Sequence, residues 1–149
     1  MSEQFVYVTY IRTTPERLWQ ALTEPEFTRS YFWETRFDSD WRVGSRWQMV
    51  FPDGSLNTHG EVLESDPPRR LVLSWINAYN PELAAEGVAR ASFEIERIGN
   101  SVKLTVIHES ERDRSKLIES VSRGWPMILA SLKSLLETGE PLEDARKRG

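Results

Sequence analysis

The stretch DRSKLIESVSRGWPMILASLKSLLETG, residues 113–139, decides the fold. Its apolar residues recur every three or four positions, the spacing that places side chains on one face of an α-helix. Gly139 is a candidate C-terminal cap. Pro126 lacks an N–H group and clashes with the preceding turn, so we expect a break or kink between Arg123 and Pro126, with the main helix running from there to Glu137. The apolar face consists of Leu117, Ile118, Val121, Trp125, Ile128, Leu129, Leu132, Leu135 and Leu136.

The N-terminal part of the chain predicts one strand followed by two short helices. Residues 5–11 are β-branched and aromatic, which favours a strand. Thr14 can cap a helix that begins at Pro15, the position where proline fits best. Pro25 interrupts this helix, and we expect a second short helix that includes Tyr31.

Residues 35–109 show the alternation and turn signals of strands. The dipeptide Gly99-Asn100 stands between alternating runs at 88–98 and 102–109, which predicts a hairpin. Because the connections are short, the strands should pair antiparallel. We therefore predict a single α+β domain over residues 1–139, in which the long helix covers one face of a sheet of about six to seven strands. The charged tail, 140–149, is expected to fray.

Composition excludes several classes of function. The chain has 149 residues, a formal net charge of −4, no cysteine and two histidines. The modest acidic balance argues against nucleic-acid binding, and the absence of cysteine excludes disulfides and cysteine-based zinc sites. His108, Glu109 and Glu111 are close in sequence, but neighbouring strand residues face opposite sides, so we predict no metal site and no cofactor. Without a signal peptide or a membrane-spanning apolar run, a cytoplasmic location without membrane insertion is the expectation.

The aromatic residues give the best indication of a site. Many of them fall on strand or helix faces that should point inward, where aromatic side chains either fill a core or line a pocket. For any single residue the core interpretation is the stronger one, and no catalytic residue is identified. Our predicted cavity lining is Trp47, Met49, Phe51, Glu61, Trp75, Phe93, His108, Trp125, Leu129 and Leu132, with Trp125 near the entrance.

Two polar residues in this set have alternative interpretations. His108 should face inward, either as a ligand anchor or proton donor or, as we favour, as a core-edge histidine bonded to a backbone carbonyl. Glu61 shares a strand face with His59 and would be costly inside unless it is protonated or paired with Arg46 or Arg90. A cyclase-like or aromatase-like enzyme would need two such polar groups to converge in the cavity, for instance His108 and Glu61.

Four stretches in order resemble the activator of heat-shock protein 90 ATPase homologue family, within the START-like (SRPBCC, helix-grip) superfamily. The likeness covers residues 5–138, and Ser45 and Pro126 depart from the family pattern. The four stretches are Thr14 to Thr23, Arg42 to Trp47, Gly60 to Glu64 followed by Pro67 to Leu71 and Trp75, and Gly124-Trp125 followed by Leu129 and Leu132.

This resemblance implies a curved sheet that grips the long helix, with a mostly apolar cavity between them. Relatives bind lipids, sterols, plant hormones or polyketides there, and a few catalyse cyclisation. Eukaryotic cochaperone members bind heat-shock protein 90 but carry an additional N-terminal domain for which this chain has no room. We therefore expect a protein that binds an apolar small molecule, with a cyclase-like enzyme or a chaperone-associated protein-binding module as alternatives. A protein partner or a homodimer is compatible with the sequence.

Overall fold

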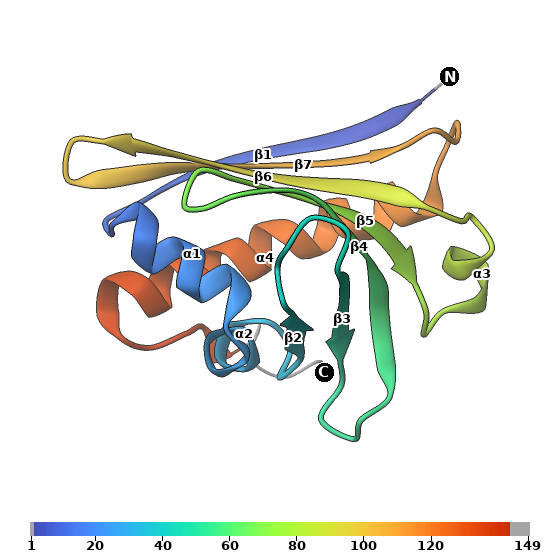
Figure 1. Ribbon diagram of the computed structural model, residues 1–149, viewed down its shortest axis with the longest axis horizontal. Helices are drawn as coiled ribbons and strands as arrows, with labels where there is room; N and C mark the ends of the chain where they lie inside the picture. Colours follow the sequence, from blue (N-terminus) through green and yellow to red (C-terminus); the bar gives the residue numbers. More distant parts are fainter. Residues whose placement is uncertain (1, 144–149) are drawn as a thin grey trace.

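A seven-stranded sheet and one long helix form the body of the molecule (Figure 1). The structure is a computed structural model in which residues 2–143 are described. In chain order the elements are β1 (Glu3–Ile11), α1 (Pro15–Thr23), α2 (Pro25–Tyr31), β2 (Arg36–Ser39), β3 (Arg46–Val50), β4 (Leu56–Asp66), β5 (Arg70–Asn77), α3 (Pro81–Ala84), β6 (Ala89–Ile98), β7 (Ser101–Ser110) and α4 (Lys116–Thr138).

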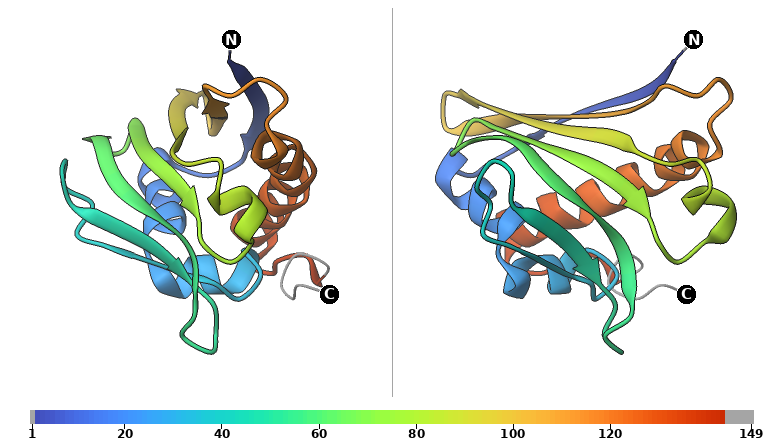
Figure 2. Two further views of the ribbon diagram at one scale, coloured as in Figure 1. Left: turned by 90° about the vertical axis from the view of Figure 1, so that its right-hand side faces the viewer. Right: turned by 45° about the vertical axis from the view of Figure 1, so that its right-hand side comes forward.

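The strands lie in the order β1-β7-β6-β5-β4-β3-β2, and every neighbouring pair is antiparallel. The sheet curves around α4, while α1 and α2 close the space between β2 and the helix (Figure 2). The predicted α+β class and helix-grip arrangement are therefore confirmed. So is the hairpin at Gly99-Asn100, which joins β6 to β7 with Ile98 opposite Ser101.

The two short helices begin where their sequence signals predict. The Thr14 hydroxyl accepts a hydrogen bond from the backbone N–H of Arg17 at 3.2 Å, and Pro15 occupies the first turn of α1. The phenol of Tyr31, on α2, donates to the carbonyl of Ala21, on α1, at 2.8 Å. This buried bond holds α2 against α1 and fixes where the chain enters β2.

Of the predicted break or kink in the C-terminal helix, the break is wrong, because α4 runs without interruption through Pro126. A proline in a helix interior costs about 3 kcal/mol. Apolar residues are buried on both sides of it, with Leu117 2% exposed before and Ile128 1% exposed after. Each such burial stabilises the helix by roughly 1.5–3 kcal/mol, so packing outweighs the local penalty. The C-terminal cap was predicted correctly: Gly139 has φ 89°, and its N–H donates to the carbonyl of Leu135.

One further segment differs from expectation. The loop after β5 contains a short helix, α3, which Asn80 caps by accepting hydrogen bonds from the backbone N–H groups of Glu82 and Leu83. At the start of the tail, the N–H of Leu142 donates to the hydroxyl of Ser131 at 3.1 Å. Residues 144–149 of the predicted frayed tail lie outside the described residues. Within residues 2–143, no helix combines the length and the hydropathy needed to cross a membrane.

Candidate functional site

An aromatic cavity lies between the first half of α4 and strands β3 to β5. Its volume is about 50 Å³. A single water needs roughly 10–15 Å³, so the space holds a few waters or one small chemical group. The apolar part of its wall is made by Phe32, Met49, Trp75, Leu117, Trp125 and Ile128.

The mouth of the cavity is formed by half-buried residues from three segments. Ser120, Val121 and Gly124 lie along one side of α4, Trp33 follows α2, and Tyr79 follows β5. Trp33 has φ 50°, in the left-handed region that bulky residues avoid. A side chain at Gly124 would place its Cβ atom 3.4 Å from the Trp33 ring. The glycine therefore lets the Trp33 indole approach the helix closely at the mouth.

Polar side chains occupy the part of the wall that β4 and β5 contribute. Asn57 and Thr58 lie near the start of β4, and Asn77, opposite Thr58 in the register, ends β5. The Thr58 hydroxyl donates to Oδ1 of Asn57 at 2.7 Å, and Oδ1 of Asn77 accepts from the N–H of Asn80 at 2.9 Å. The Nδ2 atom of Asn57 is buried without a hydrogen-bond partner. Asn57 therefore carries an unused donor, and the described lining residues of the cavity include no charged side chain.

His108 lies beside this cavity but is not part of its wall. It is fully buried, and its Nδ1 accepts a hydrogen bond from the indole nitrogen of Trp125 at 3.1 Å. Its ring also meets that of Trp75 edge-on, with centroids 4.8 Å apart. Burial lowers the pKa of His108 from 6.5 to about 3, so the ring is neutral at physiological pH. Its partner is an indole and not the backbone carbonyl that we expected.

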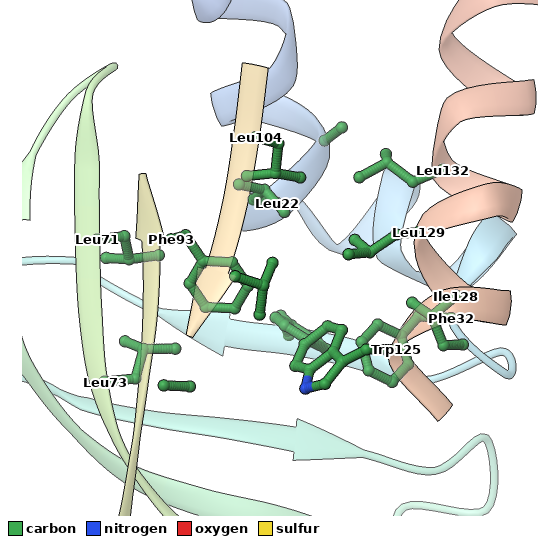
Figure 3. Close-up of a cluster of buried hydrophobic side chains, with 14 of the residues drawn as sticks. Leu22, Phe32, Leu71, Leu73, Phe93, Leu104, Trp125, Ile128, Leu129 and Leu132 are labelled. Carbon is green, nitrogen blue, oxygen red and sulfur yellow. The ribbon is translucent and has the colours of Figure 1, made fainter. Parts of the chain in front are cut away.

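Three of the predicted lining residues, Met49, Trp75 and Trp125, lie in the wall of the cavity. Trp125 is 4% exposed and forms part of the inner wall, so its expected place near the entrance is wrong. Figure 3 shows its indole extending from α4 toward the sheet, close to Phe32 and Phe93. The ring centroids of Trp125 and Phe93 are 5.8 Å apart, edge to face.

Four other predicted residues are buried in the core that surrounds the cavity. Phe93, Leu129 and Leu132 are each no more than 2% exposed and fill the space between α4 and the sheet (Figure 3). Trp47 packs against Trp75 with ring centroids 5.0 Å apart, and its indole donates to the carbonyl of Ser74 at 2.8 Å. Gly60 lies between them on β4, where a Cβ atom would come within 2.1 Å of the Ser74 carbonyl oxygen. These four side chains keep the walls in place by packing.

Two predicted lining residues do not face the cavity. Glu61 is exposed, as is Leu63, because the inward phase of β4 is carried by Thr58 and Val62. Phe51 follows the end of β3 and packs edge-on against Tyr79, with centroids 5.6 Å apart. A register shift between Met49 and Val50 buries two successive residues and ends the alternation from which the position of Phe51 was predicted. The proposed catalytic pair therefore does not exist, since Glu61 faces solvent and His108 is buried.

Most of the mouth was missed by the sequence reasoning. Trp33 and Tyr79 lie in connections whose backbone path no periodicity predicts. Asn57 was assigned to a strand, but its neighbour Thr58 is buried as well, so alternation did not mark either as inward. Gly124 is the residue with a usable signal, because a glycine in a helix interior often marks a close approach.

A carboxylate outside the cavity wall links the segment after α3 to the start of α4. Glu86, which follows α3, accepts hydrogen bonds from the hydroxyl of Ser115 at 2.6 Å and from the N–H of Lys116 at 2.8 Å. Burial raises the pKa of Glu86, but these bonds to the N-terminus of α4 outweigh it, and the net pKa is lowered. The ion pair between Lys116 and Glu82 adds a second link. The α3 segment is thus tied to the start of the helix that lines the cavity.

Fold and site together define a helix-grip protein with a small aromatic cavity under its long helix. Residues 12–137 match the family described as Activator of Hsp90 ATPase homolog 1-like protein. Because the match covers most of the chain, this protein belongs to that family. No curated protein matches the chain.

Solved structures of three other proteins show the same fold. A protein from Mesorhizobium loti is 24% identical with a TM-score of 0.76, over 90% of this chain and 96% of that one. The Aha1 dimer from Colwellia psychrerythraea is 20% identical with a TM-score of 0.74, over 92% and 98%. CalU16 from Micromonospora echinospora is 21% identical with a TM-score of 0.73, over 97% and 80%. At these identities the likeness establishes the fold alone.

Proposed function

We propose that this protein is a non-enzymatic binder of an uncharged, largely apolar small molecule, held in the cavity between α4 and strands β3 to β5. The observation that carries the proposal is the cavity wall, which is aromatic, carries a few polar groups and includes no charged side chain among the described residues. Small-molecule sites in proteins have this composition, with polar groups that orient the ligand and apolar walls that provide affinity.

The size of the cavity sets the mode of binding. An apolar cavity of about 150 Å³ accommodates benzene, and this one has about 50 Å³. The cavity therefore takes one end of a ligand, and the rest of the molecule lies in the mouth. Trp33 and Tyr79 offer flat surfaces there on which an aromatic or conjugated ligand packs.

A thermal-shift screen with flavonoids, polyketides and fatty acids tests this proposal. A variant that blocks the mouth, Ser120→Trp, provides the specificity control, because Ser120 lines the cavity. Ser122→Trp, on the same helix but outside the wall, is the matched comparison. We expect flat neutral compounds to raise the melting temperature of the wild type and of Ser122→Trp, but not of Ser120→Trp. An equal response of all three proteins, or no response to any class, would contradict the proposal.

Homodimerisation is a second candidate property, which one surface favours. On the outward face of β1, Val6, Val8 and Tyr10 are 46%, 41% and 54% exposed, and Ile107 lies opposite Val6 on β7. Contiguous exposed apolar side chains of this kind often mark an interface. The Aha1 protein from Colwellia psychrerythraea, with the same fold, is a dimer.

Light scattering after size-exclusion chromatography tests the dimer. We expect a mass twice the 17.3 kDa of the chain. Val8→Lys should reduce the mass to that of one chain, because a charge would be buried in the interface. Val43→Lys is the control, since Val43 is 66% exposed on a separate loop and should leave the dimer intact. A monomeric wild type removes this candidate without affecting the ligand proposal.

A further inference from the structure

Among the described residues that line the cavity, Asn57 is the one that carries a buried polar side-chain atom without a partner. Among the described residues, three buried side-chain atoms lack a partner: Oγ1 of Thr13, Nδ2 of Asn57 and Nε2 of His108. Thr13 and His108 are absent from the cavity wall, whereas Asn57 is part of it and is 3% exposed. Buried donors are nearly always paired in folded proteins, so this one indicates a partner that the chain itself does not supply.

The local hydrogen bonds decide what kind of partner is missing. The hydroxyl of Thr58 already donates to Oδ1 of Asn57 at 2.7 Å, which leaves the two N–H groups on Nδ2 for the ligand. The missing partner is therefore an acceptor. A carboxylate would have to be buried here without a cation, because the described cavity wall contains no Lys, Arg or His. A neutral oxygen, such as that of a carbonyl group, meets both conditions.

The neighbouring rings decide what carries this oxygen. Trp75 and Trp125 stand at 57° to each other with centroids 5.8 Å apart, and Phe32 meets Trp125 edge-on at 5.7 Å. These rings pack directly against one another in the wall, and the mouth of the cavity is lined by Trp33 and Tyr79. A flat apolar group can pack on such ring surfaces with favourable edge and face contacts.

We propose that the ligand is an uncharged aromatic carbonyl compound whose oxygen accepts a hydrogen bond from Nδ2 of Asn57, while its ring lies in the mouth. This inference rests on the proposed function and goes further, because it names the residue that selects the ligand and the chemical class that it selects. An apolar analogue of similar shape that lacks the oxygen can fill the same space, but it leaves Nδ2 of Asn57 without a hydrogen-bond partner.

A double-mutant-type cycle between protein and probe tests the assignment. The probes are acetophenone and ethylbenzene, which differ at the carbonyl, and the proteins are wild type and Asn57→Leu. Dissociation constants come from ¹⁵N NMR titrations, in which the side-chain amide of Asn57 also reports directly. The difference in water solubility between the probes cancels when the ratio of their dissociation constants is compared between the two proteins.

We expect the preference for acetophenone to fall by about fivefold or more from wild type to Asn57→Leu, the effect of one hydrogen bond. Asn100→Leu, the same replacement at an exposed hairpin amide, should keep the wild-type ratio. In the wild type, acetophenone should shift the Asn57 amide resonance more than ethylbenzene does, a result that needs no variant to fold.

Two results would overturn the inference and are distinct from each other. If both probes bind the cavity but the ratio is the same in all three proteins, Asn57 does not select the ligand and the proposed function stands. If neither probe perturbs the indole resonances of Trp75 and Trp125 up to its solubility limit, the inference and the proposed function both fail.

Discussion

The indole nitrogen of Trp125, on α4, donates a hydrogen bond to Nδ1 of His108, on β7, across 3.1 Å. Both side chains are buried, 4% and 0% exposed. Because Nδ1 accepts this bond, the neutral imidazole carries its proton on Nε2, which has no hydrogen-bond partner. This side-chain bond links helix to sheet beside the cavity and fixes the orientation of the Trp125 ring that forms part of its wall.

Loss of this bond should destabilise the fold. Trp125→Phe keeps a ring but leaves His108 without its donor, and it removes contacts to Trp75, Phe32 and Phe93. We expect the free energy of unfolding to fall by roughly 2–4 kcal/mol, from an unpaired buried acceptor together with a partial cavity. Urea denaturation followed by circular dichroism measures it.

Trp41→Phe is the matched control for that experiment. The indole of Trp41 donates to the carbonyl of Thr23 at 3.1 Å in a part-buried position, where water can replace the donor. Its loss should therefore cost only about 1 kcal/mol. Equal losses of unfolding free energy in the two variants would show that the buried Trp125–His108 bond contributes no more than the part-buried Trp41 bond.

His108 should make stability depend on pH. Burial lowers its folded-state pKa to about 3, against 6.5 in the unfolded chain. Below about pH 6.5 the unfolded state binds a proton that the folded state does not, so stability falls as pH drops toward 3, by at most about 1.4 kcal/mol per pH unit. Urea unfolding between about pH 7 and pH 5 covers the part of this window above most carboxyl titration. His108→Leu should flatten the slope, whereas His59→Gln should not; a slope unchanged in His108→Leu would refute the assignment.

The Glu86 contact should stabilise the start of α4. Glu86→Gln keeps the shape but removes the negative charge that accepts from Ser115 and Lys116 at the positive end of the helix. We expect a loss of about 1 kcal/mol near neutral pH. Because the folded pKa of Glu86 is lowered, its contribution is present above the unfolded pKa of 4.5 and is lost as pH falls through the folded value.

The difference between wild type and Glu86→Gln should therefore shrink on acidification, which chemical denaturation at a series of pH values will show. Glu119→Gln is the control, because Glu119 lies in the same first turns of α4 but is exposed and pairs with Arg123. An exposed pair of this kind contributes little, and its removal should cost no more than about 0.5 kcal/mol. A larger loss of stability in Glu119→Gln than in Glu86→Gln would argue against a stabilising contact between Glu86 and the N-terminus of α4.

Pro126 should limit the stability of α4. Pro126→Ala restores an N–H that can donate to the carbonyl of Ser122 and removes the ring clash. We expect stabilisation of about 1–3 kcal/mol, with the helix path unchanged. Met127→Ala, at the next position and 40% exposed, should change stability by less than about 0.5 kcal/mol. A destabilised Pro126→Ala protein would mean that the proline ring packs better than it obstructs.

The elements were predictable because local rules act on them directly. Thr14, Pro15 and Gly139 mark helix ends through their own hydrogen-bonding and backbone preferences, and the structure places those ends where the residues predict. The same local rule failed at Pro126, because it counts the lost N–H and the clash but not the burial of Leu117 and Ile128 on either side.

The site was less predictable than the elements. Alternation shows that a strand has two faces, but it does not show which face points inward. In β4 the face that includes Glu61 was predicted to be buried, and it is exposed. The shift after Met49 then moved Phe51 out of the series. The mouth residues Trp33 and Tyr79 lie in connections, where no period exists to read.

The amino-acid sequence by itself determined the α+β class, the order of the strands and of the helices other than α3, and the apolar face of the C-terminal helix. Those features follow from interactions between residues close in the chain. Only the tertiary structure decided that the helix continues through Pro126, that Trp125 meets His108, and that a small cavity remains with Asn57 in its wall. The reason is that a cavity is the space left when distant segments pack, and its shape depends on register and contacts that no local pattern contains.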